Sequence, residues 1–332
     1  MSALFKMLHG VKRITWYILL IELLTVWLLC GCYQKDLCYN HNHASDVTVR
    51  FDWRYAPDAN PASMFLYLLP KQSDELVLKR EYIGKDGGVA QALVGIEYAA
   101  LGFNSDVSNT LFQRASDSCF IASSKDASVI GRIGIAASEL PRVEEAEKQR
   151  KAMEVDSLWT AYLSDGVYVS LDDNDNGISP MLVLYPQRIF CTYRVTVLHV
   201  DNQDKISSSI AGAMSGLAGG INLMDGSKTS EVVTVPFAVS FASNQSLEAT
   251  FRCYGNSPVS GIPNKFVIYT VLKDGSKWCY VYDVTEQVMN APNPYEVEIL
   301  LDKLPVPSKI DGNCGLKPGV SDWNVIEIPV KM

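Results

Sequence analysis

The stretch FVIYTVL (266–272), KDGSK (273–277), WCYVYDV (278–284) points most directly to the fold. Two runs rich in β-branched and aromatic residues flank a short polar segment, which predicts two antiparallel strands joined by a turn. Asp274 and Gly275 form a dipeptide favoured in tight hairpin turns, so we expect both residues to adopt positive φ values. The chain is therefore expected to contain β-hairpins.

Short strands recur on both sides of this hairpin. Residues 47–53 and 192–197 alternate apolar and polar side chains, as strands with one solvent-exposed face do. Asp225 and Gly226 predict a second hairpin, between residues 221–224 and 232–237. This pattern, with turn residues between the strands, predicts an all-β protein made of tandem β-sandwiches.

Four segments are expected along the chain. Residues 1–31 are predicted to be a signal peptide and residues 32–45 a leader, followed by β-sandwiches over residues 46–185 and 186–332. The turn-rich stretch 172–177 lies just before the last boundary. Two segments of similar size, near the usual ~150 residues of a domain, support this division.

Composition limits the possible functions. The 332 residues are 48% hydrophobic and 20% charged, which favours a packed globular protein over intrinsic disorder. The formal net charge is −8, whereas a nucleic-acid-binding protein needs a dense cationic surface. We therefore expect no nucleic-acid partner.

The first 31 residues have the features of an export signal. Lys6, Lys12 and Arg13 precede an apolar run over residues 14–29, which is shorter than the ~20 residues that span a bilayer and contains Glu22. Leu29-Cys30-Gly31-Cys32 then resembles a bacterial lipobox. We expect cleavage before Cys32 and lipidation of its thiol, with an uncleaved membrane anchor as the alternative.

The remaining cysteines favour buried thiols over a disulfide framework, because their spacing matches no known framework. They are Cys38, Cys119, Cys191, Cys253, Cys279 and Cys314. Cys191 is in phase with Tyr193, and Cys253 is in phase with Phe251, so both thiols are expected to point into a core.

Catalytic motifs are absent from the sequence. It contains no Gly-x-Ser-x-Gly, His-Glu-x-x-His or Gly-x-Gly-x-x-Gly, and we expect neither enzymatic activity nor a cofactor. The apparent phosphate loop near residues 220–229 has the wrong order of residues and is interpreted as a β-turn. Trp53, Trp278 and Trp323 lie in strand patterns typical of core or interface positions.

Two segments contain possible metal ligands, but neither forms a complete set. Asp172, Asn174 and Asn176 match the first half of a calcium loop, yet Val183 stands where a bidentate glutamate is needed. Cys38, His41 and His43 lack a fourth zinc ligand. No metal site is predicted, and the calcium loop remains a weak candidate.

Three blocks resemble a known family. They are residues 32–43 (CYQKDLCYNHNH), residues 99–106 (AALGFNSD) and the glycine-rich run 207–220. These residues resemble fimbrillin-like lipoproteins of the Bacteroidota, which include FimB-type fimbrial anchor subunits. The resemblance implies two transthyretin-like Greek-key sandwiches and a non-enzymatic pilus anchor or accessory subunit. It also implies lipid attachment to the outer membrane, with exposure at the cell surface.

Subunits of that family join by strand addition, in which one chain completes another chain's sheet. The resemblance thus implies other fimbrial subunits as partners. The alternating terminal segment is the candidate donor strand, with Trp323, Val325, Ile326, Ile328 and Val330 as its apolar residues. The alternative is that this strand closes its own domain. An alternative function is binding of glycan or host protein through loops at the sandwich ends.

Overall fold

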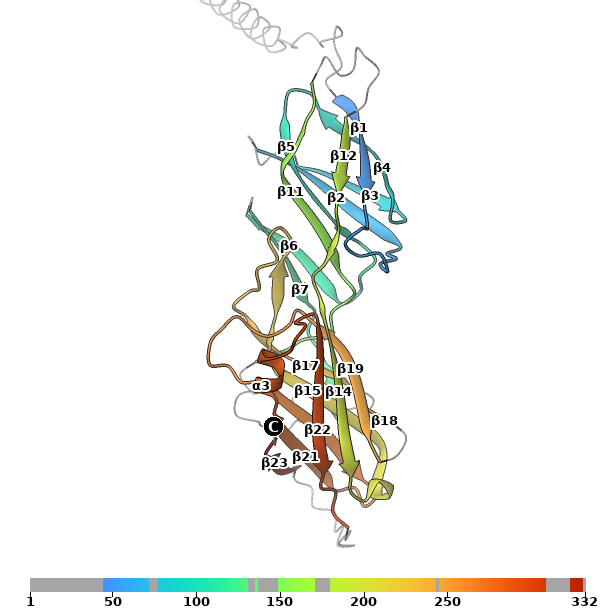
Figure 1. Ribbon diagram of the computed structural model, residues 1–332, viewed down its shortest axis with the longest axis vertical. Coiled ribbons are helices and arrows are strands. Elements are labelled where there is room, and N and C mark those ends of the chain that lie inside the picture. Colours follow the sequence, from blue (N-terminus) through green and yellow to red (C-terminus); the bar gives the residue numbers. More distant parts are fainter. Residues whose placement is uncertain are drawn as a thin grey trace, which may run out of the picture. The chain divides into compact units, whose positions relative to one another are not determined.

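Strands make up nearly all the regular structure of this computed structural model (Figure 1). The structure describes residues 44–71, 77–116, 118–130, 135–136, 149–170, 180–242, 245–308 and 323–330. Over these ranges the helical elements are η4 (Gln203–Lys205) and α3 (Thr285–Met289). The predicted all-β class is confirmed.

Two facing sheets form the first sandwich. One has the order β12-β1-β4 and the other the order β13-β11-β5-β2-β3. The first contains β12 (Met181–Leu184), β1 (Ala44–Phe51) and β4 (Gly87–Leu93). The second contains β13 (Gln187–Arg188), β11 (Trp159–Tyr168), β5 (Glu97–Asn104), β2 (Ser63–Pro70) and β3 (Leu78–Ile83).

The second sandwich is larger. Its sheets have the orders β10-β17-β15-β20-β21-β23 and β18-β19-β14-β22. The first contains β10 (Arg150–Lys151), β17 (Val232–Ala238), β15 (Ile206–Ala218), β20 (Lys265–Leu272), β21 (Lys277–Asp283) and β23 (Trp323–Ile328). The second contains β18 (Ser240–Phe241), β19 (Leu247–Cys253), β14 (Cys191–Val200) and β22 (Glu296–Leu304).

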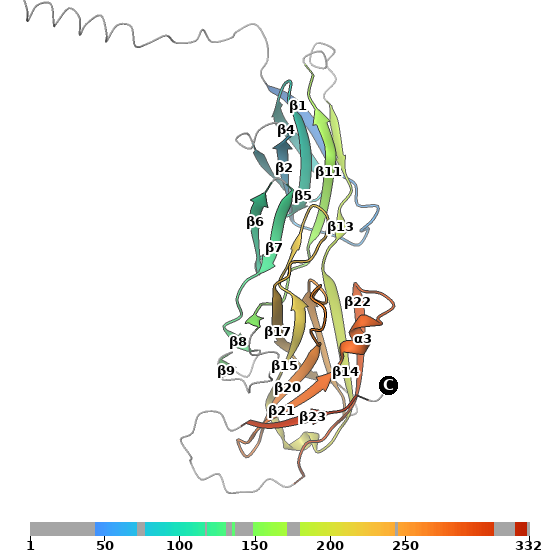
Figure 2. The same cartoon turned by 90° about the vertical axis from the view of Figure 1, so that its left-hand side faces the viewer.

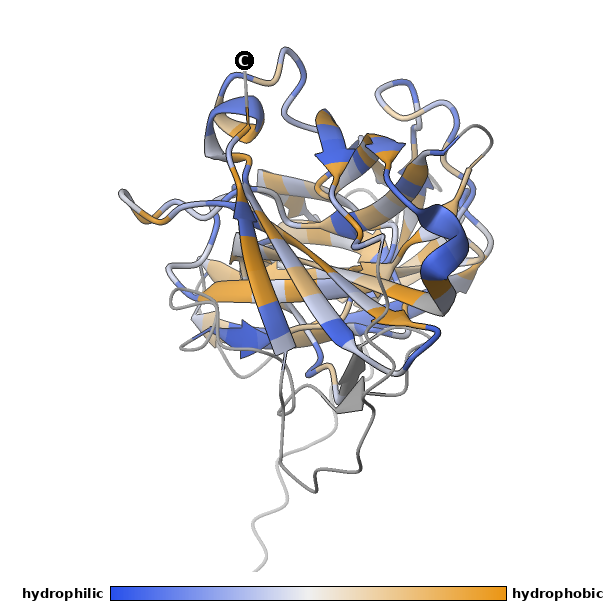
Figure 3. Ribbon diagram, turned by 90° about the horizontal axis from the view of Figure 1, so that it is seen from below, coloured by the Kyte–Doolittle hydropathy of each residue, from blue (hydrophilic) through white to orange (hydrophobic). Residues whose placement is uncertain are grey.

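Period-two alternation explains why these strands pack as sandwiches. In β1, Val47, Val49 and Phe51 are buried, while the residues between them are exposed. Figure 3 shows hydrophilic and hydrophobic residues following one another along several strands. In the second sandwich the stacked rings of Phe237 and Phe251 lie 4.1 Å apart between the two sheets. Each sandwich therefore buries one apolar face of each sheet.

Strand β5 departs from this alternation, because both of its faces are buried, as are those of β17, β20 and β21 in the second sandwich. Tyr98 and Ala100 belong to the core of the first sandwich, whereas Leu101 and Phe103 belong to a separate apolar cluster on the other face. That second cluster also contains residues of a third sheet, with the order β16-β7-β6. Its strands are β16 (Gly220–Asn222), β7 (Cys119–Ser124) and β6 (Thr110–Ser116), and β8 (Val129–Ile130) pairs separately with β9 (Ile135–Ala136).

Two strand pairings connect segments that are distant in sequence. β16 pairs antiparallel with β7, and β10 pairs parallel with β17. Residues Ala44–Met332 thus form one compact unit, distinct from residues Met1–His43. The domain boundaries at 45/46 and 185/186 stay a prediction.

The 266–284 hairpin is confirmed, but its turn differs from the expected one. Only Gly275 has a positive φ, of 83°, and its N–H donates to the carbonyl of Leu272 at 2.9 Å. The Asp274 carboxylate accepts hydrogen bonds from the Ser276 N–H and hydroxyl at 2.9 and 2.7 Å. This local bonding supports a turn with a single left-handed residue, so the prediction of two positive φ values is wrong.

The second expected hairpin is wrong in its pairing. Residues 220–222 form β16, which pairs with β7, and a single bridge joins Ile221 to Lys228. The strand after the turn, β17, pairs with β15 and β10 instead. Gly226 still provides the left-handed turn, with a φ of 73°. Asp225 has no positive φ, so the turn again has a single left-handed residue where two were expected, and the strand partners depend on distant contacts.

The expected burial of Cys191 and Cys253 is confirmed, and the described cysteines are held as free thiols. Cys191, Cys253 and Cys279 are buried and Cys119 is half-buried. Cys38 and Cys314 lie outside the described residues, as do the signal peptide and leader. Among the helices described, none has the length and apolarity needed to cross a membrane.

Candidate functional site at strand β23 and helix α3

Some predicted site residues lie outside the described part of the chain. These are Cys32, the calcium candidates Asp172, Asn174 and Asn176, and the zinc candidates Cys38, His41 and His43. In the part that the structure describes, no group of three or more His, Cys, Asp or Glu side chains could hold a metal ion. The candidate donor strand, by contrast, is described over residues 323–330.

Strand β23 is the outermost strand of the six-stranded sheet. It runs parallel to β21, with Trp323 opposite Lys277 and Ile328 opposite Tyr282 (Figure 2). The strand therefore completes a sheet of its own chain. The structure thus shows the alternative given above, in which this strand closes its own domain and is not donated to another subunit.

The two faces of β23 differ in burial. Ile326, Ile328 and the following Val330 pack against the core of the second sandwich. On the opposite face, Trp323 packs on an outer apolar cluster, while Val325 is 49% exposed. Because none of these side chains is fully buried, β23 is held less firmly than the inner strands of its sheet.

The N-terminal end of β23 makes specific contacts with its neighbours. The Trp323 ring meets the ring of Tyr269 edge to face, with centroids 5.5 Å apart. The Lys277 ammonium lies 5.7 Å from the centre of the indole, within the range of a cation–π interaction. The Asn324 amide also donates to the Lys277 carbonyl at 3.3 Å. These contacts fix the register at which β23 begins.

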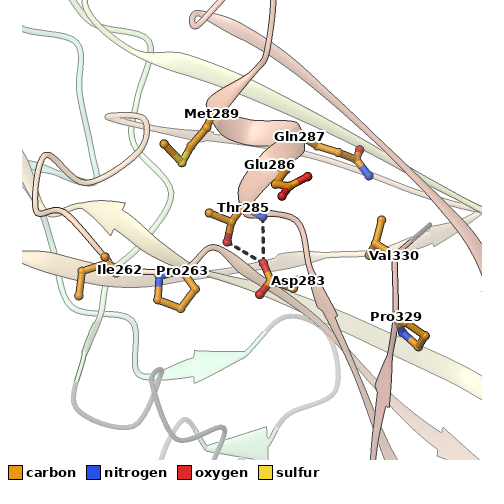
Figure 4. Close-up of a pocket in the computed structure, with 10 residues that line it drawn as sticks. Ile262, Pro263, Asp283, Thr285, Glu286, Gln287, Met289, Pro329 and Val330 are labelled. Atoms are coloured by element: carbon orange, nitrogen blue, oxygen red, sulfur yellow. Dashed lines mark hydrogen bonds between the residues drawn. The ribbon is translucent and has the colours of Figure 1, made fainter. Parts of the chain in front are cut away.

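A cleft of about 570 Å³ lies where β23 ends. Its walls are the 261–263 loop, the segment from Asp283 through α3, and Pro329 with Val330 (Figure 4). Two carboxylates, Asp283 and Glu286, lie among apolar side chains. The cleft thus combines apolar surface with two acidic groups beside the end of β23.

Asp283 is held in place by three hydrogen bonds. Its carboxylate accepts from Lys265 Nζ at 2.8 Å and from the Thr285 N–H and hydroxyl at 3.1 and 2.6 Å. Burial raises the pKa of Asp283, but these hydrogen bonds outweigh it and leave the pKa below its ordinary value of 3.8. Its stabilising effect is complete above that ordinary value and is lost as the pH falls through the lower folded-state pKa.

Helix α3 covers the free edge of β22. The side-chain amide nitrogen of Gln287 donates to the backbone carbonyl of Leu300 at 3.0 Å, and the backbone N–H of Leu300 donates to the side-chain oxygen of Gln287 (Oε1) at 2.9 Å. One side chain thus makes the pair of hydrogen bonds that a neighbouring strand would make. It occupies the middle of an edge that could otherwise pair with another chain.

A second group of side chains lies at the end of strands β1 and β12. These strands are parallel, with Phe51 opposite Leu184, so the residues after them emerge together. Tyr55 and Tyr185 are 63% and 39% exposed, with ring centroids 6.1 Å apart. The Arg54 guanidinium lies 4.9 Å from the Tyr185 ring centre and pairs with Asp52 at 2.6 Å. The result is an exposed aromatic and ionic group on a loop.

Sequence reasoning missed both Gln287 and the Tyr55–Tyr185 group. Nothing in the sequence around Gln287 indicates that its amide reaches a strand edge. Tyr55 and Tyr185 are far apart in the chain, and only the parallel pairing of β1 with β12 brings them together. The three tryptophans singled out from sequence are half-buried and pack against apolar clusters, as expected.

Comparison with known proteins shows the family. A family model described as a domain of unknown function, DUF5119, matches residues 31–238. The chain belongs to the DUF5119 family. No curated protein sequence matches it.

Solved structures resemble this DUF5119 protein in fold. A candidate adhesin from Bacteroides ovatus has a TM-score of 0.58 and 18% identity, covering 83% of this chain and 99% of that one. The fimbrial anchor protein Mfa2 from Porphyromonas gingivalis has a TM-score of 0.46 and 13% identity, covering 78% and 90%. A candidate polysaccharide-binding protein (DUF1812) from Bacteroides thetaiotaomicron has a TM-score of 0.48 and 10% identity, covering 78% and 90%.

Replacing Gln287 tests its role at the β22 edge. Gln287→Ala removes both hydrogen bonds to Leu300, so we expect about tenfold faster exchange of the Leu300 amide hydrogen and a loss of about 1 kcal/mol in unfolding free energy. The neighbouring exposed Glu286→Ala should change neither quantity. Unchanged Leu300 exchange in Gln287→Ala would contradict this role.

Proposed function

We propose that this protein is a non-enzymatic, lipid-anchored subunit of a bacterial cell-surface fimbrium, acting in assembly or adhesion. The position of β23 carries the proposal, because it is an edge strand with partly exposed apolar side chains. The similarity in fold to a candidate adhesin from Bacteroides ovatus supports a surface role. The anchor role specifically rests on Cys32.

Strand addition is the proposed mode of assembly. An incoming strand gains affinity from backbone hydrogen bonds and specificity from pockets for alternate side chains. In β23, Ile326 and Ile328 supply such side chains, as does Val330 just beyond it. Release of β23 would expose the backbone edge of β21, together with part of the surface of Trp278 and Tyr280. The same edge could then receive the corresponding strand of another subunit.

The lipid anchor is proposed from the sequence before Cys32. Cleavage there would leave a lipidated cysteine at the start of the leader, which leads into β1 at Ala44. A protein carrying two or more acyl chains stays stably attached to a membrane without spanning it. The proposed location is the outer membrane, with the sandwiches at the cell surface.

Removing β23 tests strand exchange. A variant lacking residues 323–332 should bind a fluorescent peptide of residues 323–330 at least tenfold more tightly than the full chain, whose own strand occupies the site. Fluorescence anisotropy gives the two dissociation constants, and circular dichroism verifies that the shortened variant remains β-rich. A control peptide with Ile326→Asp and Ile328→Asp should not bind. Equal affinity for both proteins would rule out exchange at this edge.

Metabolic labelling tests the anchor. Cells given a palmitate analogue should incorporate it into the wild-type protein and not into Cys32→Ala, because the acyl chains need the thiol of the mature N-terminus. The Cys30→Ala variant is the matched control and should keep the label. Surface proteolysis of intact cells then shows on which side of the membrane the sandwiches lie. Equal labelling of wild type and Cys32→Ala would refute the anchor.

The exposed tyrosines favour a second candidate function, binding of a surface glycan. A sugar ring can stack its apolar face on an aromatic ring, while its hydroxyl groups bond to nearby charged side chains. Tyr55 offers the exposed ring, and the Asp52–Arg54 pair offers acceptors and donors beside it. Trp53 steadies this loop by donating its indole N–H to the Lys85 carbonyl at 2.8 Å.

A glycan array tests this second function. The wild-type protein should retain defined glycans, and Tyr55→Ala should weaken that retention by tenfold or more through loss of stacking area. Tyr168→Ala, which removes another exposed tyrosine at 60% exposure, is the control and should bind normally. Absence of glycan retention by the folded wild type counts against this function and leaves the assembly role as the sole proposal.

A further inference from the structure

Cys191 and Cys253 lie directly opposite each other in the second sandwich. Cys191 begins β14, Cys253 ends β19, and the antiparallel register pairs one residue with the other. Both side chains point to the same inner face and are 5% and 1% exposed. The two thiols therefore belong to adjacent strands and share one side of the sheet.

This placement is compatible with a disulfide. Residues directly opposite in an antiparallel pair have Cα atoms about 4.5 to 5.5 Å apart and Cβ atoms about 4.5 to 5.5 Å apart. A disulfide needs Cα atoms about 4.4 to 6.8 Å apart and Cβ atoms about 3.5 to 4.5 Å apart. A change of rotamer and a small approach of the strands would suffice.

Gly255 leaves space beside both sulfurs. Its N–H donates to Cys253 Sγ at 3.3 Å, and a Cβ atom on this residue would lie 3.0 Å from Cys191 Sγ. Its φ of +84° is also a conformation that favours glycine. Lys228 Nζ would lie 2.8 Å from the same Cβ position, so a cation sits close to the two thiols.

The other described cysteines have no such counterpart. Cys279, on β21, has Tyr269 and Val325 as its register partners, and Cys119, on β7, has Ser116. Among the cysteines that the structure describes, Cys191 and Cys253 are thus the pair that faces across neighbouring strands. The structure holds both as free thiols.

We propose that Cys191 and Cys253 form an intramolecular disulfide when the chain folds in an oxidising compartment. The oxidant is a disulfide R–S–S–R, supplied by a thiol oxidase or a small molecule. One cysteine thiolate attacks it to give a mixed disulfide and release one thiol R–SH. The second cysteine then displaces the other R–SH, so two S–H bonds of the protein are replaced by one S–S bond.

The folded state disfavours late oxidation. Burial raises the pKa of Cys253 well above its ordinary value and also raises that of Cys191, although Lys228 acts in the opposite direction on both. The neutral thiol is a poor nucleophile, so a protein that has already folded in reduced form reacts slowly. Oxidation is therefore expected while the strands are still assembling.

The bond would join β14, an inner strand of its sheet, to β19. It closes a long loop that contains β15, β16 and β17. Closing such a loop restricts the unfolded chain, which stabilises the folded state. The proposal does not depend on β23 or Cys32 taking part in fimbrial assembly.

Refolding in a redox buffer tests the proposal. The full-length protein is unfolded and reduced, then refolded with oxidised and reduced glutathione. The product is denatured in the presence of N-ethylmaleimide, so that buried as well as exposed free thiols are blocked. Peptide mass spectrometry should find Cys191 linked to Cys253. The thermal midpoint of the oxidised protein should exceed that of the reduced protein by about 5 °C.

Matched variants identify the pair. Cys191→Ser and Cys253→Ser should each abolish the linked peptide and the rise in midpoint, while Cys279→Ser should keep both. Circular dichroism checks that each variant refolds. Recovery of folded wild type with both thiols alkylated by N-ethylmaleimide, or with one of them linked to a different cysteine, would overturn the proposal.

Discussion

Burial of β5 on both faces is the constraint on which the described structure depends. One face closes the core of the first sandwich through Tyr98 and Ala100, and the other packs Leu101 and Phe103 against the third sheet. Because the third sheet includes β16, contributed by residues 220–222, the same strand ties the two halves of the chain together. A polar substitution at Ala100 would disturb the first cluster, and one at the neighbouring Leu101 would disturb the second.

The edge strands β22 and β23 of the second sandwich differ in how far they are covered. The edge of β22 is occupied by Gln287, whose amide satisfies the backbone of Leu300. The other sheet of the same sandwich ends in β23, whose side chains are only partly buried. Both features lie next to α3, whose Val288 is buried in the core between the sheets. One edge is thus covered by a side chain, and the other is the edge at which the proposed strand exchange would take place.

Local patterns predicted much of this fold, whereas distant pairings could not be predicted. The alternation of apolar and polar residues in β1 and β14 predicted which of their side chains point into the core. The dipeptide Asp274-Gly275 predicted the position of the hairpin turn. The same reasoning failed for residues 221–224, because the partner of that strand is β7, about one hundred residues away. Cys191 and Cys253 were expected to point inward, but their direct opposition depends on the register of β14 with β19. The aromatic group of Tyr55 and Tyr185 likewise depends on a parallel pairing.

The position of β1 within its sheet affects how the molecule would bear mechanical load. It lies between β12 and β4, pairing with β4 from Ala44 onward and with β12 from Thr48 onward. A force directed along this strand would shear its lateral hydrogen bonds together, and they would not open one after another. A tether attached before Ala44 would therefore meet high resistance to rupture at the first element of the sandwich.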